Sequence, residues 1–167
     1  HLVGNVMIDT LMTQLERAKE SKILENMRLE KGQYGVVTLH RPANVDDKQV
    51  LGSLIDVLLE ISSETPLVFP IHPRTKSRLE AFDLMAKLES AANVHCIGPA
   101  GYLDFLCLTS NAKVIVTDSG GLQEESTALG IPCLTMRPST ERPVTCSEGT
   151  STLIGSDADK LRVFLNQ

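Results

Sequence analysis

The hydrophobic positions of this chain alternate between two spacings, which predicts helices and strands in turn. Over residues 4–22 the apolar residues recur at steps of three and four, so they share one face of a helix. These residues are Ile8, Leu11, Leu15 and Ala18. The next apolar run, 34–39, is short and rich in β-branched residues, as expected for a buried parallel strand.

The same alternation continues to the end of the sequence. Helices are predicted over residues 48–62, 75–89, 103–110, 122–129 and from 157 onward. Strands are predicted over residues 66–71, 93–97, 113–117, 132–136 and 152–154. Such an order implies right-handed crossovers and a parallel sheet with helices on both faces. The pattern predicts an α/β fold, a Rossmann-like parallel sheet flanked by helices, in a single domain over residues 1–167.

Composition narrows the classes of function. Of the 167 residues, 42% are hydrophobic and 22% are charged, which is typical of a globular domain. The net charge of −5 argues against a nucleic-acid partner, because binding phosphates requires a basic face. No apolar run approaches the roughly 18 residues that a membrane span needs. We therefore expect neither nucleic acid nor membrane as a partner.

The four cysteines carry no metal-binding or disulfide pattern. They are Cys96, Cys107, Cys133 and Cys146. None forms a C-x-x-C pair, and three lie in apolar segments, so reduced structural thiols are the better interpretation. We predict a cytoplasmic protein without a metal site.

In open α/β sheets, ligands bind beyond the carboxyl ends of the strands. The most informative of these loops follows the strand 113–117. There Ser119 is a suitable N-cap residue, and Gly120 and Gly121 open the next helix, so a phosphate can approach the free backbone N–H groups. An ordinary glycine-containing turn is the alternative interpretation.

Two acidic residues follow one turn later. Glu125 shares a helix face with Gly121 and Leu122, which turns it toward the sheet, where it can accept hydrogen bonds from the hydroxyls of a ribose. Glu124 points elsewhere and is predicted to be a solvated helix charge.

Further candidates, two histidines and two arginines, lie in the neighbouring loops. His40 and His72 each follow a buried strand, where an imidazole can donate to a phosphate or move a proton. A lone histidine is more often structural, but two at two strand ends favour a ligand. The loop 136–143 carries two arginines suited to phosphate, with a surface arginine paired to Glu141 as the alternative.

Taken together, these segments resemble the C-terminal half of the non-hydrolysing UDP-N-acetylglucosamine 2-epimerases. The segments are Gly4-Asn5 with Ile8-Asp9, residues 38–44, His72-Pro73, residues 117–125 and residues 140–143. The run Thr-Asp-Ser-Gly-Gly-x-Gln-Glu-Glu followed by Thr-Glu-Arg-Pro is the most specific of them. The resemblance covers nearly the whole chain.

The resemblance implies one half of a glycosyltransferase-B type two-domain fold. It implies an enzyme, an isomerase, that interconverts UDP-N-acetylglucosamine and UDP-N-acetylmannosamine by eliminating UDP and adding it back, without a cofactor. It also implies a role in cell-surface polysaccharide biosynthesis and a homodimeric full-length protein.

The family's functional residues carry over onto matching positions. The resemblance makes His40 the catalytic residue, Ser119, Gly120 and Gly121 the diphosphate site, Glu125 the ribose ligand, Arg142 a UDP-binding arginine and Phe105 a neighbour of the uracil. Arg41 and His72 fall where many bacterial members bind a second, activating UDP-sugar, and this chain has Ala43 where those members have a carboxylate.

The family takes its proton-transfer carboxylates from an N-terminal domain that this chain does not contain, so we expect the chain alone to be inactive. Two alternatives remain open from the sequence. One is the nucleotide-sugar domain of a glycosyltransferase-B type glycosyltransferase, and the other is a non-catalytic nucleotide-binding module.

Overall fold

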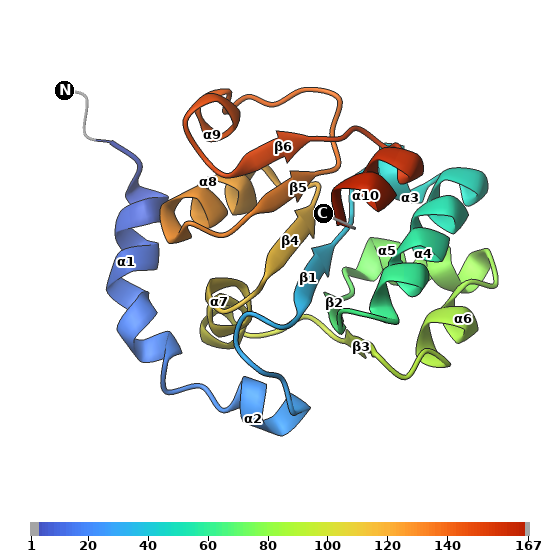
Figure 1. Ribbon diagram of the computed structural model, residues 1–167, viewed down its shortest axis with the longest axis horizontal. Helices are drawn as coiled ribbons and strands as arrows, with labels where there is room; N and C mark the ends of the chain where they lie inside the picture. Colours follow the sequence, from blue (N-terminus) through green and yellow to red (C-terminus); the bar gives the residue numbers. More distant parts are fainter. Residues whose placement is uncertain (1–3, 166–167) are drawn as a thin grey trace.

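The protein is built on one six-stranded parallel sheet. The computed structural model describes residues 4–165 and gives the strand order β3-β2-β1-β4-β5-β6 (Figure 1). The strands are β1 (Gly35–Thr38), β2 (Leu67–Pro70), β3 (Val94–Ile97), β4 (Val114–Thr117), β5 (Cys133–Thr135) and β6 (Ser151–Leu153). The predicted fold class is confirmed.

The chain builds this sheet outward from its centre in both directions. It steps from β1 to β2 and β3, returns to pair β4 with β1 from Gly35↔Val114 to Thr38↔Thr117, and then adds β5 and β6. The order therefore reverses between β1 and β4. In sheets of this kind the crevice at the carboxyl ends of those two strands is where ligands bind.

Helices cover both faces of the sheet. They are α1 (Val6–Ala18), α2 (Ile23–Met27), α3 (Pro42–Val45), α4 (Lys48–Ser62), α5 (Pro73–Ala81), α6 (Met85–Glu89), α7 (Tyr102–Ser110), α8 (Gly120–Leu129), α9 (Val144–Ser147) and α10 (Ala158–Leu165). The group α1, α2, α7 and α8 covers one face, and α4, α5, α6 and α10 cover the other (Figure 1). None of the helices within residues 4–165 combines the length and the hydropathy that crossing a bilayer needs.

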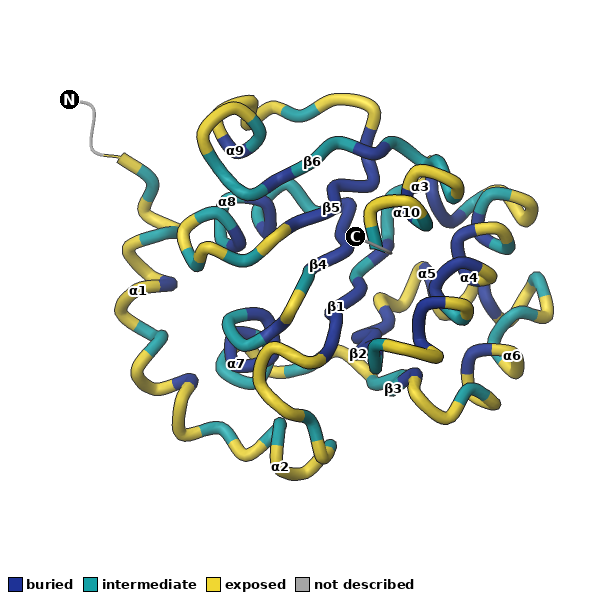
Figure 2. Tube along the Cα trace, viewed as in Figure 1, coloured by how far each residue is buried: buried dark blue, intermediate teal, exposed yellow. Residues whose placement is uncertain are grey.

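The core lies between the sheet and these two helical layers. Successive strand residues point to opposite faces, so Val36 packs with Leu108 and Leu122 while Val37 packs with the residues of α4. The central strands are buried on both sides, and exposure is concentrated in the loops and outer helix faces (Figure 2). This rigid centre fixes where the loops at the strand ends begin.

The predicted helix 75–89 is wrong in one respect, because the structure divides it into α5 and α6. Asp83 adopts a left-handed conformation with φ 60°, and the Leu84 amide donates back to the Leu79 carbonyl at 2.8 Å. That bond closes a Schellman motif, which ends a helix even though no glycine is present to mark it.

The N-terminal helix is also shorter than predicted. Of the predicted range 4–22 only Val6–Ala18 forms α1. The short helix α2, which was not predicted, follows beyond that range and ends at Arg28 with φ 56°. The short helix α3 lies in a segment predicted as a loop, and α9 lies in residues for which no element was predicted, since four residues are too few to show a helical period.

Candidate functional site

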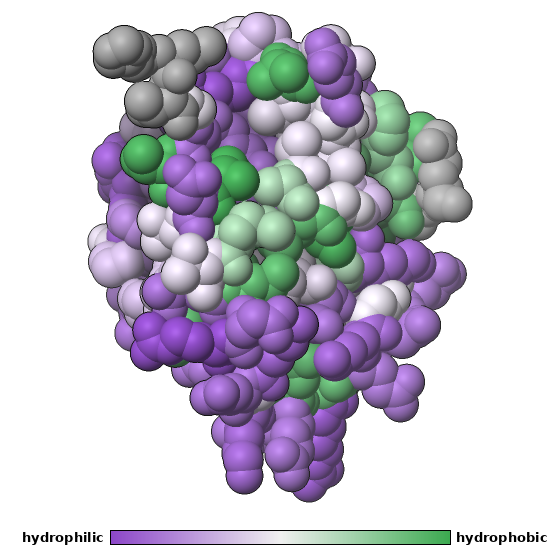
Figure 3. All heavy atoms as spheres, turned by 90° about the vertical axis from the view of Figure 1, so that its left-hand side faces the viewer, coloured by the Kyte–Doolittle hydropathy of each residue, from purple (hydrophilic) through white to green (hydrophobic). Residues whose placement is uncertain are grey.

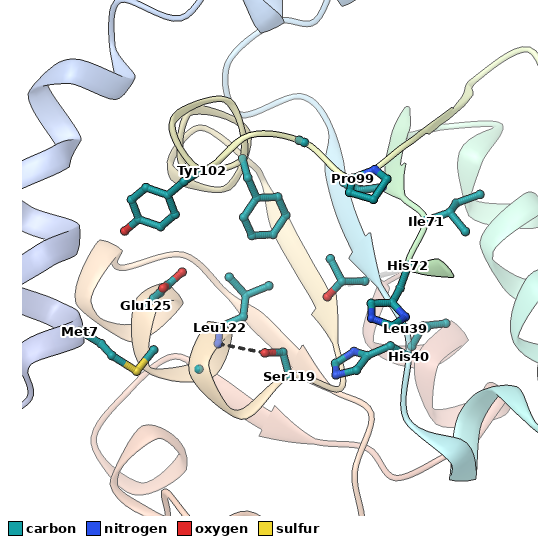
Figure 4. A pocket seen from close by; sticks show the side chains of 15 residues that line it. Met7, Leu39, His40, Ile71, His72, Pro99, Tyr102, Ser119, Leu122 and Glu125 are labelled. Atoms are coloured by element: carbon teal, nitrogen blue, oxygen red, sulfur yellow. Dashed lines mark hydrogen bonds between the residues drawn. The ribbon is translucent and has the colours of Figure 1, made fainter. Parts of the chain in front are cut away.

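A pocket of about 420 Å³ opens at the carboxyl ends of the central strands (Figure 4). It is lined by Met7, Thr38, Leu39, His40, Pro70, Ile71, His72, Pro99, Ala100, Tyr102, Phe105, Ser119, Gly121, Leu122 and Glu125. Most of this lining is apolar, and a few polar groups converge on it, which is the usual composition of a small-molecule site. The pocket lies where the order of the strands reverses.

The mouth of the pocket has an apolar border on the side of α1. Met7 of α1 and Tyr102 at the start of α7 both line the pocket and are exposed, as are Val6 and Met12 nearby. Figure 3 views this side and shows apolar side chains gathered within a mostly polar surface. Met7 was not predicted as a site residue, because it lies outside the inward stripe of its helix.

The amino terminus of α8 faces the pocket through Ser119 and Gly121. The predicted N-cap is confirmed, since the Ser119 Oγ accepts from the Leu122 N–H at 3.5 Å (Figure 4). The first N–H groups of a helix have no acceptor within it, and the helix dipole adds positive potential there. This end of α8 can therefore bind an anion.

Arg137 adds a second positive group beside the same helix end. Its side chain is buried, and its Nη1 lies 3.5 Å from where a Cβ on Gly120 would be. Both terminal nitrogens donate to Glu141, at 2.8 and 2.6 Å, and this pair lowers the pKa of the Glu141 carboxyl to about 2. The pairing with Glu141 that we considered for a surface arginine is thus made by a buried one.

Glu125 lies in the pocket with Gly121 and Leu122, as its place on the helix predicted. Burial raises the pKa of its carboxyl, and the neighbouring charge of Glu124 raises it further. The pKa of Tyr102 is raised by burial and then by the charge of Glu125. A carboxylate in such surroundings gains from a ligand that brings hydroxyl donors.

The prediction that Glu124 is a solvated helix charge is wrong. Its side chain is 15% exposed and accepts from Asn5 Nδ2 at 2.8 Å, while Arg142 Nε lies 3.1 Å from the same oxygen. Asn5 caps α1 and Arg142 lies in the loop after β5, so Glu124 joins three distant segments. No local pattern could reveal these partners.

His40 follows β1 and is held by Asp118, which follows β4. The His40 Nδ1 lies 2.7 Å from Asp118 Oδ1, and the backbone N–H groups of His40 and Arg41 donate to Asp118 Oδ2 at 2.9 and 2.8 Å. Asp118 has no exposed side-chain surface. It carried no role in the sequence analysis, although a carboxylate between a buried strand and an N-cap is itself an unusual signal.

Asn44 completes the attachment of this loop. It is fully buried and donates through Nδ2 to Asp118 Oδ2 at 3.0 Å and to the Met136 carbonyl at 2.9 Å. Its Oδ1 accepts from Ser156 Oγ at 2.5 Å. The loops after β1, β4, β5 and β6 are thereby joined around one buried carboxylate and one buried amide.

The candidate residues divide into two groups by position. His40, His72, Phe105, Ser119, Gly121 and Glu125 line the pocket, and the rings of His40 and His72 are 5.3 Å apart. Within residues 4–165, Gly120, Arg41 and Arg142 lie outside that lining. Arg41 Nε donates to the Asp118 carbonyl at 2.8 Å, and Arg142 pairs with Glu124.

The arrangement can bind an anion at α8, hold a diol at Glu125 and move a proton at His40. Within residues 4–165 no three or more His, Cys, Asp or Glu side chains are grouped so as to hold a metal ion.

Comparisons with known proteins point to one family of sugar-nucleotide epimerases. A family model described as UDP-N-acetylglucosamine 2-epimerase matches residues 1–166. The chain is 41% identical over 165 residues to the UDP-N-acetylglucosamine 2-epimerase of Methanocaldococcus jannaschii, covering 96% of this chain and 45% of that protein. It is 38% identical to the UDP-2,3-diacetamido-2,3-dideoxy-D-glucuronate 2-epimerase of Pseudomonas aeruginosa, over 95% of this chain and 42% of that protein.

Solved structures give the same result. The M. jannaschii enzyme in complex with UDP-GlcNAc and UDP superposes with a TM-score of 0.89 at 40% identity, covering 99% of this chain and 48% of that one. A heptosyltransferase of E. coli, at 19% identity and a TM-score of 0.57, shares the fold alone. The chain thus spans less than half the length of the relatives it matches.

Proposed function

The chain belongs to the UDP-N-acetylglucosamine 2-epimerase family, and from that premise we propose that it is the UDP-binding part of an enzyme that interconverts UDP-N-acetylglucosamine and UDP-N-acetylmannosamine. The observation that carries the proposal is the meeting of the α8 amino terminus and Glu125 in one mostly apolar pocket. UDP combines the three matching groups: an anion for the α8 amino terminus, a ribose diol for Glu125 and an aromatic base for the apolar wall of the pocket.

In the proposed complex the diphosphate lies on the N–H groups of Gly120 and Gly121, with the Ser119 hydroxyl beside them, because the Ser119 N–H already donates to Thr117 Oγ1 at 3.0 Å. The ribose hydroxyls donate to Glu125, four residues further along the same helix. The uracil lies against Phe105, beside the apolar wall of Pro99 and Ala100. This order places the sugar near His40. Arg142 pairs with Glu124 in the absence of ligand, and we propose that it leaves Glu124 to bind the phosphates.

The proposed reaction removes the proton at C2 of the sugar and breaks the C1–O bond to UDP, which leaves a glycal. Protonation at C2 from the other face and re-addition of UDP at C1 give the epimer. His40 serves as an acid or base beside the phosphates. We infer that the carboxylates for the C2 proton belong to the remainder of the full-length protein, so that the chain alone binds UDP without turning over a UDP-sugar.

Calorimetric titration of this chain tests the proposal. We expect UDP to bind, ADP to bind far more weakly, and Glu125→Ala to lose at least about tenfold in UDP affinity, because a charge-assisted hydrogen bond disappears. Glu80→Ala, at an exposed position on α5, is the matched control and keeps the wild-type affinity. Equal UDP affinities in Glu125→Ala and wild type would contradict the proposed site.

The sugar is tested separately, in the full-length protein. The relative from P. aeruginosa makes a diacetamido glucuronate the natural competitor to UDP-N-acetylglucosamine. We expect epimerisation of UDP-N-acetylglucosamine, followed by NMR. Turnover of the diacetamido glucuronate alone would show that the proposed sugar is wrong, and it would not contradict the proposed UDP site.

A further inference from the structure

We propose that Asp118 is a positioning residue that keeps the proton of His40 on Nδ1 and so presents Nε2 to the pocket as a hydrogen-bond acceptor. The relation between the two residues follows from their contacts alone. Only its consequence for turnover rests on the proposed function.

The Asp118 carboxylate is surrounded by donors. It lies within hydrogen-bonding distance of the His40 and Arg41 backbone N–H groups, of Asn44 Nδ2 and of His40 Nδ1, the last at 2.7 Å. An ionised carboxylate can only accept hydrogen bonds, so the ring nitrogen facing it carries a proton. Because the carboxylate is fully buried, losing any of these donors is costly, which fixes the ring as well as the loop.

His72 holds the opposite tautomer beside it. Its Nδ1 accepts from the Arg74 N–H at 3.2 Å, where it caps α5, so in the neutral ring the proton lies on Nε2. The two ring centroids are 5.3 Å apart and both side chains line the pocket. The two histidines therefore present one acceptor, His40 Nε2, and one donor, His72 Nε2–H, to the same ligand.

The acceptor decides what His40 can do in its neutral form. With Nε2 unprotonated, the ring can take a proton from a bound molecule and return it, whereas it cannot donate to a phosphate without first becoming charged. Asp118 would then stabilise the imidazolium formed during proton transfer and keep its orientation. Asp118 itself does not touch the ligand.

Long-range ¹H–¹⁵N NMR spectra of the labelled chain read the tautomers directly. At about pH 8, above the ordinary imidazole pKa, we expect the Nδ1–H form for His40 and the Nε2–H form for His72, assigned with His40→Asn and His72→Asn. A wild-type spectrum that shows His40 in the Nε2–H form overturns the proposal. This measurement needs no variant at position 118, so it decides the matter even if substitutions there unfold the chain.

Asp118→Asn tests the cause. Its amide can donate to Nδ1, so in folded protein the Nε2–H population of His40 should rise. Asp47→Asn is the matched control, because Asp47 caps α4 and should leave His40 unchanged. A folded Asp118→Asn variant with the wild-type tautomer overturns the proposal.

The full-length protein then tests the consequence for turnover. There we expect Asp118→Asn to lower kcat by about 100-fold or more with UDP affinity close to wild type. An unchanged kcat in Asp118→Asn overturns the role of Asp118 in turnover. A wild-type full-length protein without epimerase activity overturns the proposed function instead, and the tautomers of His40 and His72 are then still decided by the NMR spectra.

Discussion

At the scale of single residues, Glu125 opposes the stability of the unliganded protein. Its pKa is raised by burial and by Glu124 above the ordinary 4.5, so the folded state binds a proton more readily than the unfolded state. The stability that this protonation brings is present below the unfolded pKa and is lost as pH rises through the folded pKa. At neutral pH the charged form is therefore unfavourable.

We predict that Glu125→Gln raises the free energy of unfolding at about pH 8. The gain should be less than about 1 kcal/mol, because water screens a partly exposed charge. The difference between the variant and the wild type should shrink at about pH 5. Urea denaturation at both pH values measures it. Glu124→Gln is the comparison, since it weakens the contacts to Asn5 and Arg142 and should destabilise. A loss of stability in Glu125→Gln at about pH 8 would contradict the prediction.

Substitution of Gly120 should affect stability and ligand binding in opposite directions. An added Cβ there meets only Arg137 Nη1, at 3.5 Å, which is ordinary contact. We expect Gly120→Ala to keep or slightly raise stability, because alanine favours the helix by up to about 1 kcal/mol. The methyl group should lower UDP affinity at least about tenfold, because it keeps the phosphate from the backbone.

Gly52→Ala is the control for that experiment. Gly52 lies within α4, and apart from the adjacent backbone of that helix nothing lies within 4 Å of its added Cβ. It should gain stability by about 1 kcal/mol and bind UDP as the wild type does. Calorimetry and urea denaturation on both variants would expose a general effect of replacing glycine, which would appear as a parallel loss of affinity.

The residues that the sequence revealed are those whose signal is local. Ser119 and Glu125 could be predicted from three- and four-residue spacings within one helix. Asp118 and Glu124 could not, since their partners lie 78 and 119 positions away along the chain. Pairing at that range depends on which strands and helices the fold brings together, so the sequence identifies neither partner, even where the residue itself is unusual, as Asp118 is between a buried strand and an N-cap.

At the scale of elements, hydrophobic spacing located the helices and strands well and their ends less well. The strand 113–117 is observed as β4 almost unchanged, and the helix 48–62 as α4. The break at Asp83 escaped because it depends on backbone conformation and not on hydrophobic period. Left-handed residues of this kind are strained unless they are glycine.

The break at Asp83 gives a prediction for stability. Asp83→Gly should stabilise the chain by about 1 kcal/mol or less, because glycine adopts φ 60° without steric penalty. Asp83→Ala should destabilise it by a similar amount. Urea midpoints with unchanged slopes would establish both effects, and a less stable Asp83→Gly would show that the aspartate side chain contributes more than its backbone strain takes away.

At the scale of the whole molecule, alternation of helix and strand was sufficient to predict a parallel sheet covered on both faces. It could not give the order of the strands. The pairing of β1 with β4 joins Val36 to Ile115 across the intervening β2 and β3 segments, and only packing selects it. The pocket depends on that choice, because His40 follows β1 and Asp118 follows β4.

This strand order also bears on folding kinetics. Residues 35–97 pair among neighbours in sequence, while the β1–β4 ladder must close a far longer loop, and long-range contacts form slowly. We therefore expect the pocket to be completed late, after the transition state for folding. A ligand such as UDP should slow unfolding in stopped-flow experiments and leave the refolding rate nearly unchanged, whereas faster refolding with UDP would mean that the two halves of the sheet meet early. The nucleotide would then stabilise the native state kinetically: it lengthens the lifetime of the folded protein without contributing to its formation.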